Sequence, residues 1–160
     1  MLRISVACVG RIKEKYLIDG LKEYEKRRSW YCRFSWLEVA DEKTPEDASE
    51  AEETNIRRIE GDRLLKKIPQ DAYVIALTID GKARNSLDFS SHLDRLAATG
   101  VSHVVFVIGG SIGLSEDVVA RAKETLSFSA MTFPHQLMRL ILVEQLYRAF
   151  RISRNEPYHK

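Results

Sequence analysis

Residues 104 to 114 have the sequence Val104-Val105-Phe106-Val107-Ile108-Gly109-Gly110-Ser111-Ile112-Gly113-Leu114. The unbroken apolar run at its start is typical of a strand buried on both faces, as in the centre of a parallel sheet. Glycines directly after such a strand leave backbone amides and carbonyls uncovered at the sheet edge, where α/β proteins hold small ligands. A tight turn without a ligand has the same features. Residues 109–114, here called the glycine loop, are therefore either a ligand-binding site or only a tight turn after the strand.

Strand-like and helix-like segments alternate on both sides of this stretch. Strands are expected at 2–9, 33–39, 72–79, 103–108 and 126–129, and helices at 14–28, 44–67, 86–98, 115–124 and 134–150. In the second helix, Thr44 is expected as the cap and Pro45 as the first helical residue. Residues 80–82 are expected to form a turn. This order predicts a single α/β domain over residues 1–160, with a mostly parallel sheet and helices on both faces.

Composition excludes several classes of protein. Apolar residues make up 44% and charged residues 30% of the 160 residues, which is typical of a soluble globular domain. No apolar run approaches the length of a membrane span, and the start is interpreted as a strand and not as a leader, so we expect a cytoplasmic protein without membrane contact. Cys8 and Cys32 have neither disulfide-framework nor metal-site spacing, so no metal is expected.

The glycine loop does not match the common phosphate-binding patterns. Its spacing differs from G-x-G-x-x-G, and it lacks the Gly-Lys-Ser/Thr ending of a Walker loop. Glu116 and Asp117 follow at the start of the next expected helix, after the capping residue Ser115, and would repel a phosphate. The loop is therefore predicted to hold a ligand that lacks phosphate or carries positive charge.

A second candidate segment follows the glycine loop. It is Phe128-Ser129-Ala130-Met131-Thr132-Phe133, in which large apolar residues alternate with small or polar ones, and it is here called the second loop. Its backbone could bind the edge of a flat heterocycle, while Phe128, Met131 and Phe133 form apolar walls. The alternative interpretation is that these three side chains only fill the core beneath the last helix.

The last expected helix has apolar residues over more than half of its circumference, which suggests a homodimer interface in addition to its own core contacts. Four arginines on or after it, Arg139, Arg148, Arg151 and Arg154, are placed to meet phosphates, or form an ordinary solvated face. The tail is Asn155-Glu156-Pro157-Tyr158-His159-Lys160. It is either disordered or functional, because Tyr158 can stack on a base and His159 can titrate near neutral pH.

Several segments together resemble one known family. They are Val9-Gly10-Arg11-Ile12-Lys13, Phe106-Val107-Ile108-Gly109-Gly110, residues 126–135, Glu144-Gln145-Leu146-Tyr147-Arg148-Ala149 and Pro157-Tyr158-His159-Lys160. In this order over the full chain they resemble the ribosomal RNA large-subunit methyltransferase H family, of the SPOUT class. The resemblance implies a SPOUT-type sheet with a C-terminal trefoil knot, the knot and cofactor site lying in about 72–160. It also implies a homodimer.

The resemblance further implies S-adenosylmethionine as methyl donor and N3 of a pseudouridine in 23S rRNA, on the assembled ribosome, as acceptor. The implied cofactor contacts are Leu77, Gly109, Phe128, Ser129, Ala130, Met131, Thr132 and Phe133. N3 must lose a proton, so we hypothesise that His159 or Tyr158 lies near the base while Arg154 or Arg148 stabilises negative charge. The first alternative is a ribosome- or RNA-binding module without catalysis. A flavodoxin-like nucleotide-binding domain is a more distant alternative.

Overall fold

The computed structural model describes residues 1–160 and contains five strands and five helices in strict alternation, as predicted. The strands are β1 (Arg3–Val9), β2 (Arg33–Val39), β3 (Tyr73–Ala83), β4 (His103–Ile108) and β5 (Glu124–Ser127). The helices are α1 (Lys15–Arg28), α2 (Glu50–Lys67), α3 (Ser86–Ala98), α4 (Glu116–Arg121) and α5 (His135–Ser153). None of these helices is both long and apolar enough to cross a lipid bilayer.

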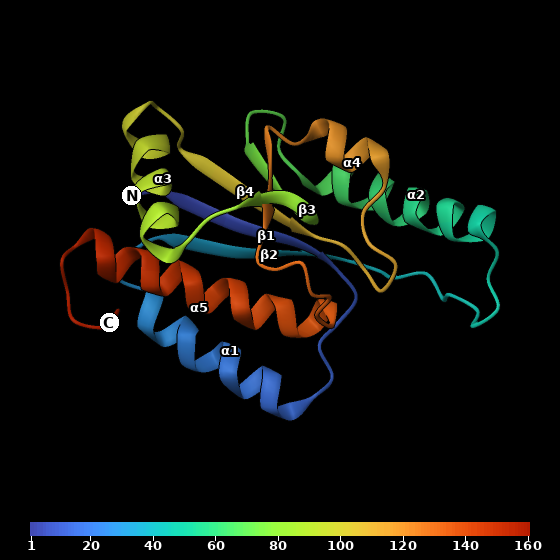
Figure 1. The fold of residues 1–160 in the computed structure, drawn as a ribbon, viewed down its shortest axis with the longest axis horizontal. Coiled ribbons are helices and arrows are strands. Elements are labelled where there is room, and N and C mark those ends of the chain that lie inside the picture. Colours follow the sequence, from blue (N-terminus) through green and yellow to red (C-terminus); the bar gives the residue numbers. More distant parts are fainter.

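The five strands form one sheet in the order β2-β1-β4-β3-β5, and every neighbouring pair is parallel. The apolar run of β4 is therefore in the centre, with β1 on one side and β3 on the other, as its composition predicted. Because all strands run the same way, their carboxyl ends share one edge of the sheet. The loops after β1, β2, β4 and β5 meet at this edge (Figure 1).

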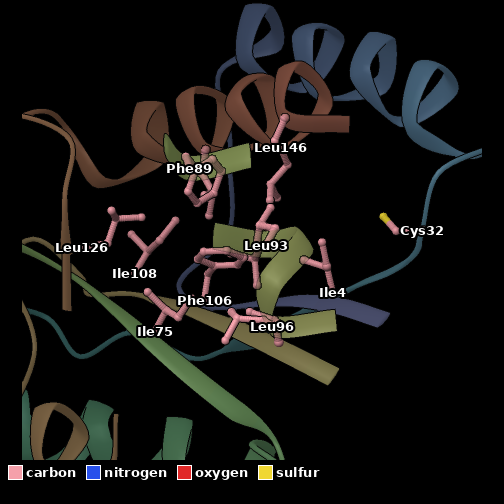
Figure 2. Packing of buried hydrophobic residues seen from close by; sticks show 14 of the residues in the cluster. Ile4, Cys32, Ile75, Phe89, Leu93, Leu96, Phe106, Ile108, Leu126 and Leu146 are labelled. Carbon is pink, nitrogen blue, oxygen red and sulfur yellow. The ribbon is translucent and has the colours of Figure 1, made fainter. Parts of the chain in front are cut away.

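Helices cover both faces of the sheet, which confirms the predicted layers (Figure 1). Side chains of β4 alternate between two core clusters: Val104, Phe106 and Ile108 belong to one, and Val105 and Val107 to the other. The first cluster also contains side chains of α3 and α5 and is shown in Figure 2. The second contains side chains of α2 and α4.

Helix α2 begins later than predicted, because Ser49 and not Thr44 is its cap. The Ser49 hydroxyl accepts a hydrogen bond from the backbone N–H of Glu52 at 3.1 Å, and the Glu52 carboxylate accepts from the Ser49 N–H at 3.3 Å. This reciprocal pair is a capping box. The capping box satisfies the backbone N–H groups of Ser49 and Glu52. This favours a helix start at Ser49 over a start at Pro45.

The third strand continues through residues 80–82, where a turn was predicted. It pairs with β5 on both sides of a register shift, Leu77 and Lys82 both lying opposite Leu126. Gly81 makes this possible, because a Cβ at Gly81 would lie 2.8 Å from the Leu126 nitrogen. The fifth strand accordingly lies at 124–127 and not 126–129, and the preceding helix ends at Arg121.

Both cysteines are buried and free. Burial raises the pKa of the Cys8 thiol to about 12 and that of Cys32 to about 11. Both side chains are thus neutral thiols at physiological pH. No group of three or more His, Cys, Asp or Glu side chains is arranged to hold a metal ion.

Candidate active site

One cavity of about 750 Å³ opens at the carboxyl edge of the sheet. Its volume is in the range of small-molecule sites. It is formed by the end of β3, the glycine loop, the second loop, the first turns of α5 and one side chain of α2. Its lining residues are Glu53, Leu77, Thr78, Ile79, Ile108, Gly109, Gly110, Ser111, Ile112, Gly113, Leu114, Leu126, Phe128, Ser129, Met131, Thr132, Phe133, Pro134, His135 and Met138.

The glycine loop folds back on itself directly after β4. Gly110 and Gly113 form an antiparallel bridge, in which the Gly113 N–H donates to the Gly110 carbonyl at 3.1 Å. Gly113 has φ of +88°, which favours glycine. A Cβ at Gly109 would lie 2.6 Å from the Gly113 carbonyl carbon, so only glycine fits there. The loop therefore offers bare backbone to the cavity, as predicted.

The second loop forms the facing wall of the cavity. Its conformation is fixed by the Ser127 hydroxyl, which donates to the Ile79 carbonyl at 2.8 Å, and by the Met131 N–H, which donates to the Ser129 hydroxyl at 2.9 Å. Phe128 lines the cavity and also packs against the core. The structure brings together Leu77, Gly109, Phe128, Ser129, Met131, Thr132 and Phe133 of the predicted cofactor residues; Ala130 does not line the cavity.

The cavity contains no lysine or arginine. Its ionisable side chains are Glu53, from α2, and His135, from the first turn of α5; neither was among the predicted contacts. Burial, together with the nearby Arg139 guanidinium, lowers the pKa of His135, which keeps the imidazole neutral at neutral pH. The electrostatic character of the cavity suits a cation and disfavours a phosphate. This agrees with the ligand class predicted from Glu116 and Asp117.

Arg139 does not meet phosphates, contrary to the prediction, because only 1% of its surface is exposed. One terminal nitrogen donates to the carbonyls of Val9 and Gly10 at 2.8 Å each, and the other donates to the Glu38 carboxylate at 2.8 Å. The guanidinium thus ties α5 to the ends of β1 and β2. Its role is structural and it fixes the helix that supplies His135.

A buried carboxyl lies behind the glycine loop. Glu60 of α2 is 4% exposed; one of its oxygens accepts from the Glu42 N–H at 3.0 Å, and the other has no partner. A Cβ at Gly110 would lie 2.9 Å from that second oxygen, which places it against the loop. Burial raises the pKa of Glu60. Helix α2 is therefore in direct contact with the back of the glycine loop.

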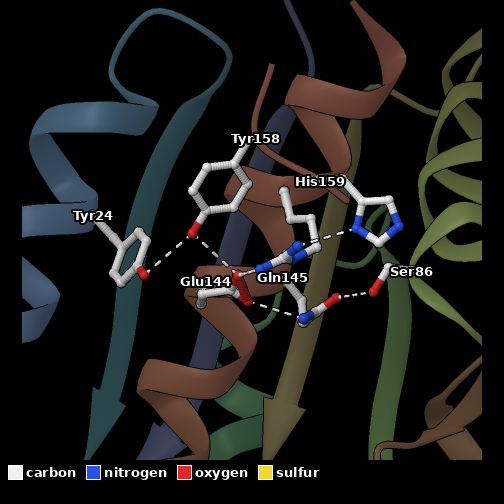
Figure 3. A network of polar contacts seen from close by, with 7 residues as sticks. Tyr24, Ser86, Glu144, Gln145, Tyr158 and His159 are labelled. Carbon is white, nitrogen blue, oxygen red and sulfur yellow. Dashed lines mark hydrogen bonds and ion pairs between the residues drawn. The ribbon is translucent and has the colours of Figure 1, made fainter. Parts of the chain in front are cut away.

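The tail is ordered and folds onto α5 and α1 (Figure 3). The Tyr158 hydroxyl donates to the Glu144 carboxylate at 3.3 Å and lies 3.4 Å from the Tyr24 hydroxyl. Arg148 bonds the same carboxylate and lies 3.0 Å from Nδ1 of His159. Because arginine can only donate, Nδ1 accepts and the proton of a neutral His159 ring is on Nε2. Tyr158 and His159 thus share one network.

This network lies away from the cavity within one chain. No residue of the tail lines the cavity, and Arg148, which holds His159, is about 20 Å further along α5 than His135. Arg154 is not in the network; its guanidinium stacks over the Tyr31 ring at 4.9 Å. The predicted cofactor residues and the predicted catalytic residues are therefore two separate groups in the monomer.

The broad apolar surface of α5 is accounted for within the chain, because α1 and α3 both pack on this helix. Gly20 of α1, for example, allows the Leu140 side chain to approach closely. The breadth of α5 therefore does not by itself require a partner. Two of the exposed large apolar side chains line the cavity, Ile79 at 53% and Met131 at 74% exposed, while Tyr16, Trp30 and Leu87 are exposed elsewhere.

Comparison with known proteins agrees with this geometry. A family model described as predicted SPOUT methyltransferase matches residues 2–159. Proteins named ribosomal RNA large subunit methyltransferase H, from an Exiguobacterium species and from Listeria monocytogenes, are each 57% identical to this chain over 159 residues, covering 99% of it and all of each relative. A solved structure titled a probable methylase family protein, from Haemophilus influenzae Rd KW20, matches with a TM-score of 0.56 and 10% identity over 98% of this chain and 70% of that one. This last similarity concerns the fold alone.

Proposed function

The chain belongs to the SPOUT methyltransferase family, and on that premise we propose that it methylates N3 of a pseudouridine in 23S rRNA on the assembled ribosome, with S-adenosylmethionine as donor. The full-length relatives are named for the large ribosomal RNA subunit, which supports this class of acceptor. The observation that carries the choice of donor is a cavity without lysine or arginine beside a bare glycine loop. A phosphate-bearing cofactor would find no counter-charge there.

The residues present fit this donor. Adenine is a flat heterocycle, and Phe128, Phe133 and Met138 offer apolar walls beside the free backbone groups of the second loop. Gly109 leaves room that any Cβ would fill. When bound, S-adenosylmethionine supplies an electrophilic methyl group on a positively charged sulfur, so the protein mainly has to align the nucleophile. The cofactor residues are proposed to be those predicted, with Glu53 and His135 added and Ala130 left out.

The tail is proposed to stabilise the pseudouridine anion. Burial and the bonds to Tyr24 and Glu144 raise the pKa of Tyr158, so this side chain remains a neutral phenol at neutral pH. His159 presents its Nε2–H outward, since Nδ1 faces Arg148. Donors beside a cationic guanidinium favour an anionic base and ease the loss of the N3 proton. The proposed roles of Tyr158, His159 and Arg154 are therefore hydrogen bonding and charge stabilisation, and no general base is assigned.

A homodimer would reconcile the two separate groups of residues. In a two-fold dimer with antiparallel α5 helices, the tail of one protomer lies at the cavity end of the other. The exposed Ile79 and Met131 at the cavity mouth support an interface in this region. Each methyl-transfer site then combines a cavity from one protomer with Tyr158 and His159 from its partner.

Two further parts of the proposal rest on family membership. The trefoil knot is assigned to about residues 72–160, where β3, the glycine loop, β5 and the second loop surround the cavity. The cytoplasm is assigned as the location, because the proposed substrate is the assembled ribosome.

The proposal is tested with the purified protein, S-adenosylmethionine and ribosomes whose rRNA lacks the modification. We expect one methyl group per 23S rRNA, located at N3 of a pseudouridine by mass spectrometry of nuclease fragments. The alternative, a ribosome-binding module without catalysis, predicts co-sedimentation with ribosomes but no methyl group. Binding of the donor by calorimetry separates a failure of the donor site from a failure of the acceptor.

Removing residues 158–160 is expected to reduce methyl transfer by at least about 100-fold, because the hydrogen-bond donors at the developing anion are lost. Affinity for the donor should stay within twofold, since none of these residues lines the cavity. Calorimetry and single-turnover methylation measure the two effects. Full methyl transfer by the truncated protein would reject the proposed role of the tail.

Mixing two inactive variants tests whether the tail acts across the dimer. One variant carries Gly109→Ala in the cavity, and the other lacks residues 158–160. If tails act on the partner, the mixed dimer has one site with an intact cavity and an intact tail, and activity returns. If tails act within their own chain, every site remains defective and the mixture stays inactive. Each parent protein alone is the matched control.

A further inference from the structure

Glu53 is a carboxylate without a partner at the wall of the cavity. It is partly buried, lines the cavity and forms no salt bridge or side-chain hydrogen bond. The other acidic residues in the first turn of α2 differ: Glu52 belongs to the capping box, and Glu50 is exposed to solvent. A carboxylate on a cavity wall with no protein partner is available to pair with a cationic ligand. This makes Glu53 a candidate contact for a charged ligand.

The position of Glu53 is fixed because α2 is docked on the glycine loop. One turn after Glu53, Arg57 donates to the Ile112 carbonyl at 3.3 Å and to the Thr54 hydroxyl at 3.2 Å. Two turns after it, Gly61 lies so close to Ser115 that a Cβ would collide with the Ser115 hydroxyl. These residues lie on one face of the helix. Arg57 is thereby held by the loop and does not line the cavity.

We infer that Glu53 is the counter-charge for the sulfonium of the methyl donor and makes the site prefer S-adenosylmethionine over S-adenosylhomocysteine. The inference rests on the proposed function, which supplies the donor. The methionyl end of the donor carries an ammonium and its own carboxylate, and their interactions with Glu53 oppose each other. The sulfonium is the one uncompensated positive charge, and no lysine or arginine lines the cavity to compete for Glu53.

This preference has a functional consequence. After N3 has released its proton to solvent, its electron pair bonds to the methyl carbon, and the electron pair of the broken carbon–sulfur bond stays on sulfur, which becomes a neutral thioether. The attraction to Glu53 is then lost, while the contacts to the adenine remain. Glu53 therefore weakens the binding of the product relative to the donor and favours exchange after each transfer.

The test is calorimetry of Glu53→Gln with three probes, measured on the full-length protein. We expect S-adenosylmethionine and sinefungin, which has an amine in place of the methylated sulfonium, to bind about tenfold more weakly because one close charge pair is lost. S-adenosylhomocysteine should bind within twofold of its affinity for the wild type. Glu50→Gln is the matched control, since it removes the same charge from the same turn at an exposed position.

Each outcome decides the inference. An equal loss for all three probes would assign Glu53 to the ammonium or to the shape of the cavity and would overturn it. Unchanged affinities for the cationic probes would overturn it as well. If the wild type binds none of the probes, the proposed donor itself is wrong, whereas binding to the wild type with unchanged selectivity in Glu53→Gln rejects only the role of Glu53.

Discussion

Gly109→Ala is expected to abolish detectable binding of S-adenosylmethionine while leaving a folded protein. The new Cβ would lie 2.6 Å from the carbonyl carbon and 2.8 Å from the oxygen of Gly113. Both atoms belong to backbone, so no side-chain rotation relieves the collision. The loop must open, and the bridge between Gly110 and Gly113 is lost. Because displacement of a site by about 1 Å can reduce a rate 100-fold, we expect at least that loss of affinity.

Gly100→Ala is the control for this variant. Gly100 also requires glycine, with φ of +98°, but a Cβ at this position would meet no atom within 4 Å, and the residue does not line the cavity. This change should lower the free energy of unfolding by about 1 kcal/mol through backbone strain and leave donor affinity unchanged. Calorimetry and urea denaturation report the two quantities. Wild-type donor affinity in Gly109→Ala would show that the glycine loop does not form the site.

The sequence predicted most accurately those helices and strands whose first and last residues are indicated by neighbouring residues. The strands at 33–39 and 103–108 and the helix at 86–98 have the predicted bounds. The start of α2 was wrong although Ser49-x-x-Glu52 is a capping-box pattern, because Pro45 suggested an earlier start. The turn at 80–82 was wrong for another reason. Lys82 and Ala83 pair with β5 after a register shift, and pairing between segments distant in sequence is not encoded in local propensity.

The parts of the candidate site that are continuous segments of sequence could be predicted. The glycine loop and the second loop follow strands that end at the same edge, so they could be found as motifs. Glu53 and His135 were missed because they come from helices whose approach to the loops depends on the order of the strands. The separation of Tyr158 and His159 from the cavity also required the structure, since it results from the length of α5. Arg139 could not be distinguished from surface arginines by sequence, because burial of a guanidinium depends on its acceptors.

Arg139→Met is expected to lower the free energy of unfolding by about 2–6 kcal/mol, because two backbone carbonyls lose their donor at a cost of about 1–3 kcal/mol each. Three acceptors lose their donor: the carbonyls of Val9 and Gly10 and the carboxylate of Glu38. The carbonyls belong to the buried last residue of β1 and the buried residue after it, where water does not replace the guanidinium easily. Arg139→Lys should lose less than the methionine variant, because it keeps the charge, but one ammonium cannot reproduce the planar fork of donors.

Urea denaturation of both variants measures this effect, with Arg58→Met as the control. Arg58 forms an exposed salt bridge with Asp62 at 3.3 Å, and such pairs contribute at most about 1 kcal/mol. Because Arg139 fixes the first turns of α5, we also expect weaker donor binding in Arg139→Met at temperatures where it remains folded. A loss of stability no larger than that of the control would mean that the carbonyls of β1 find other donors. The position of α5, which brings His135 and Met138 to the cavity, would then depend on apolar packing alone.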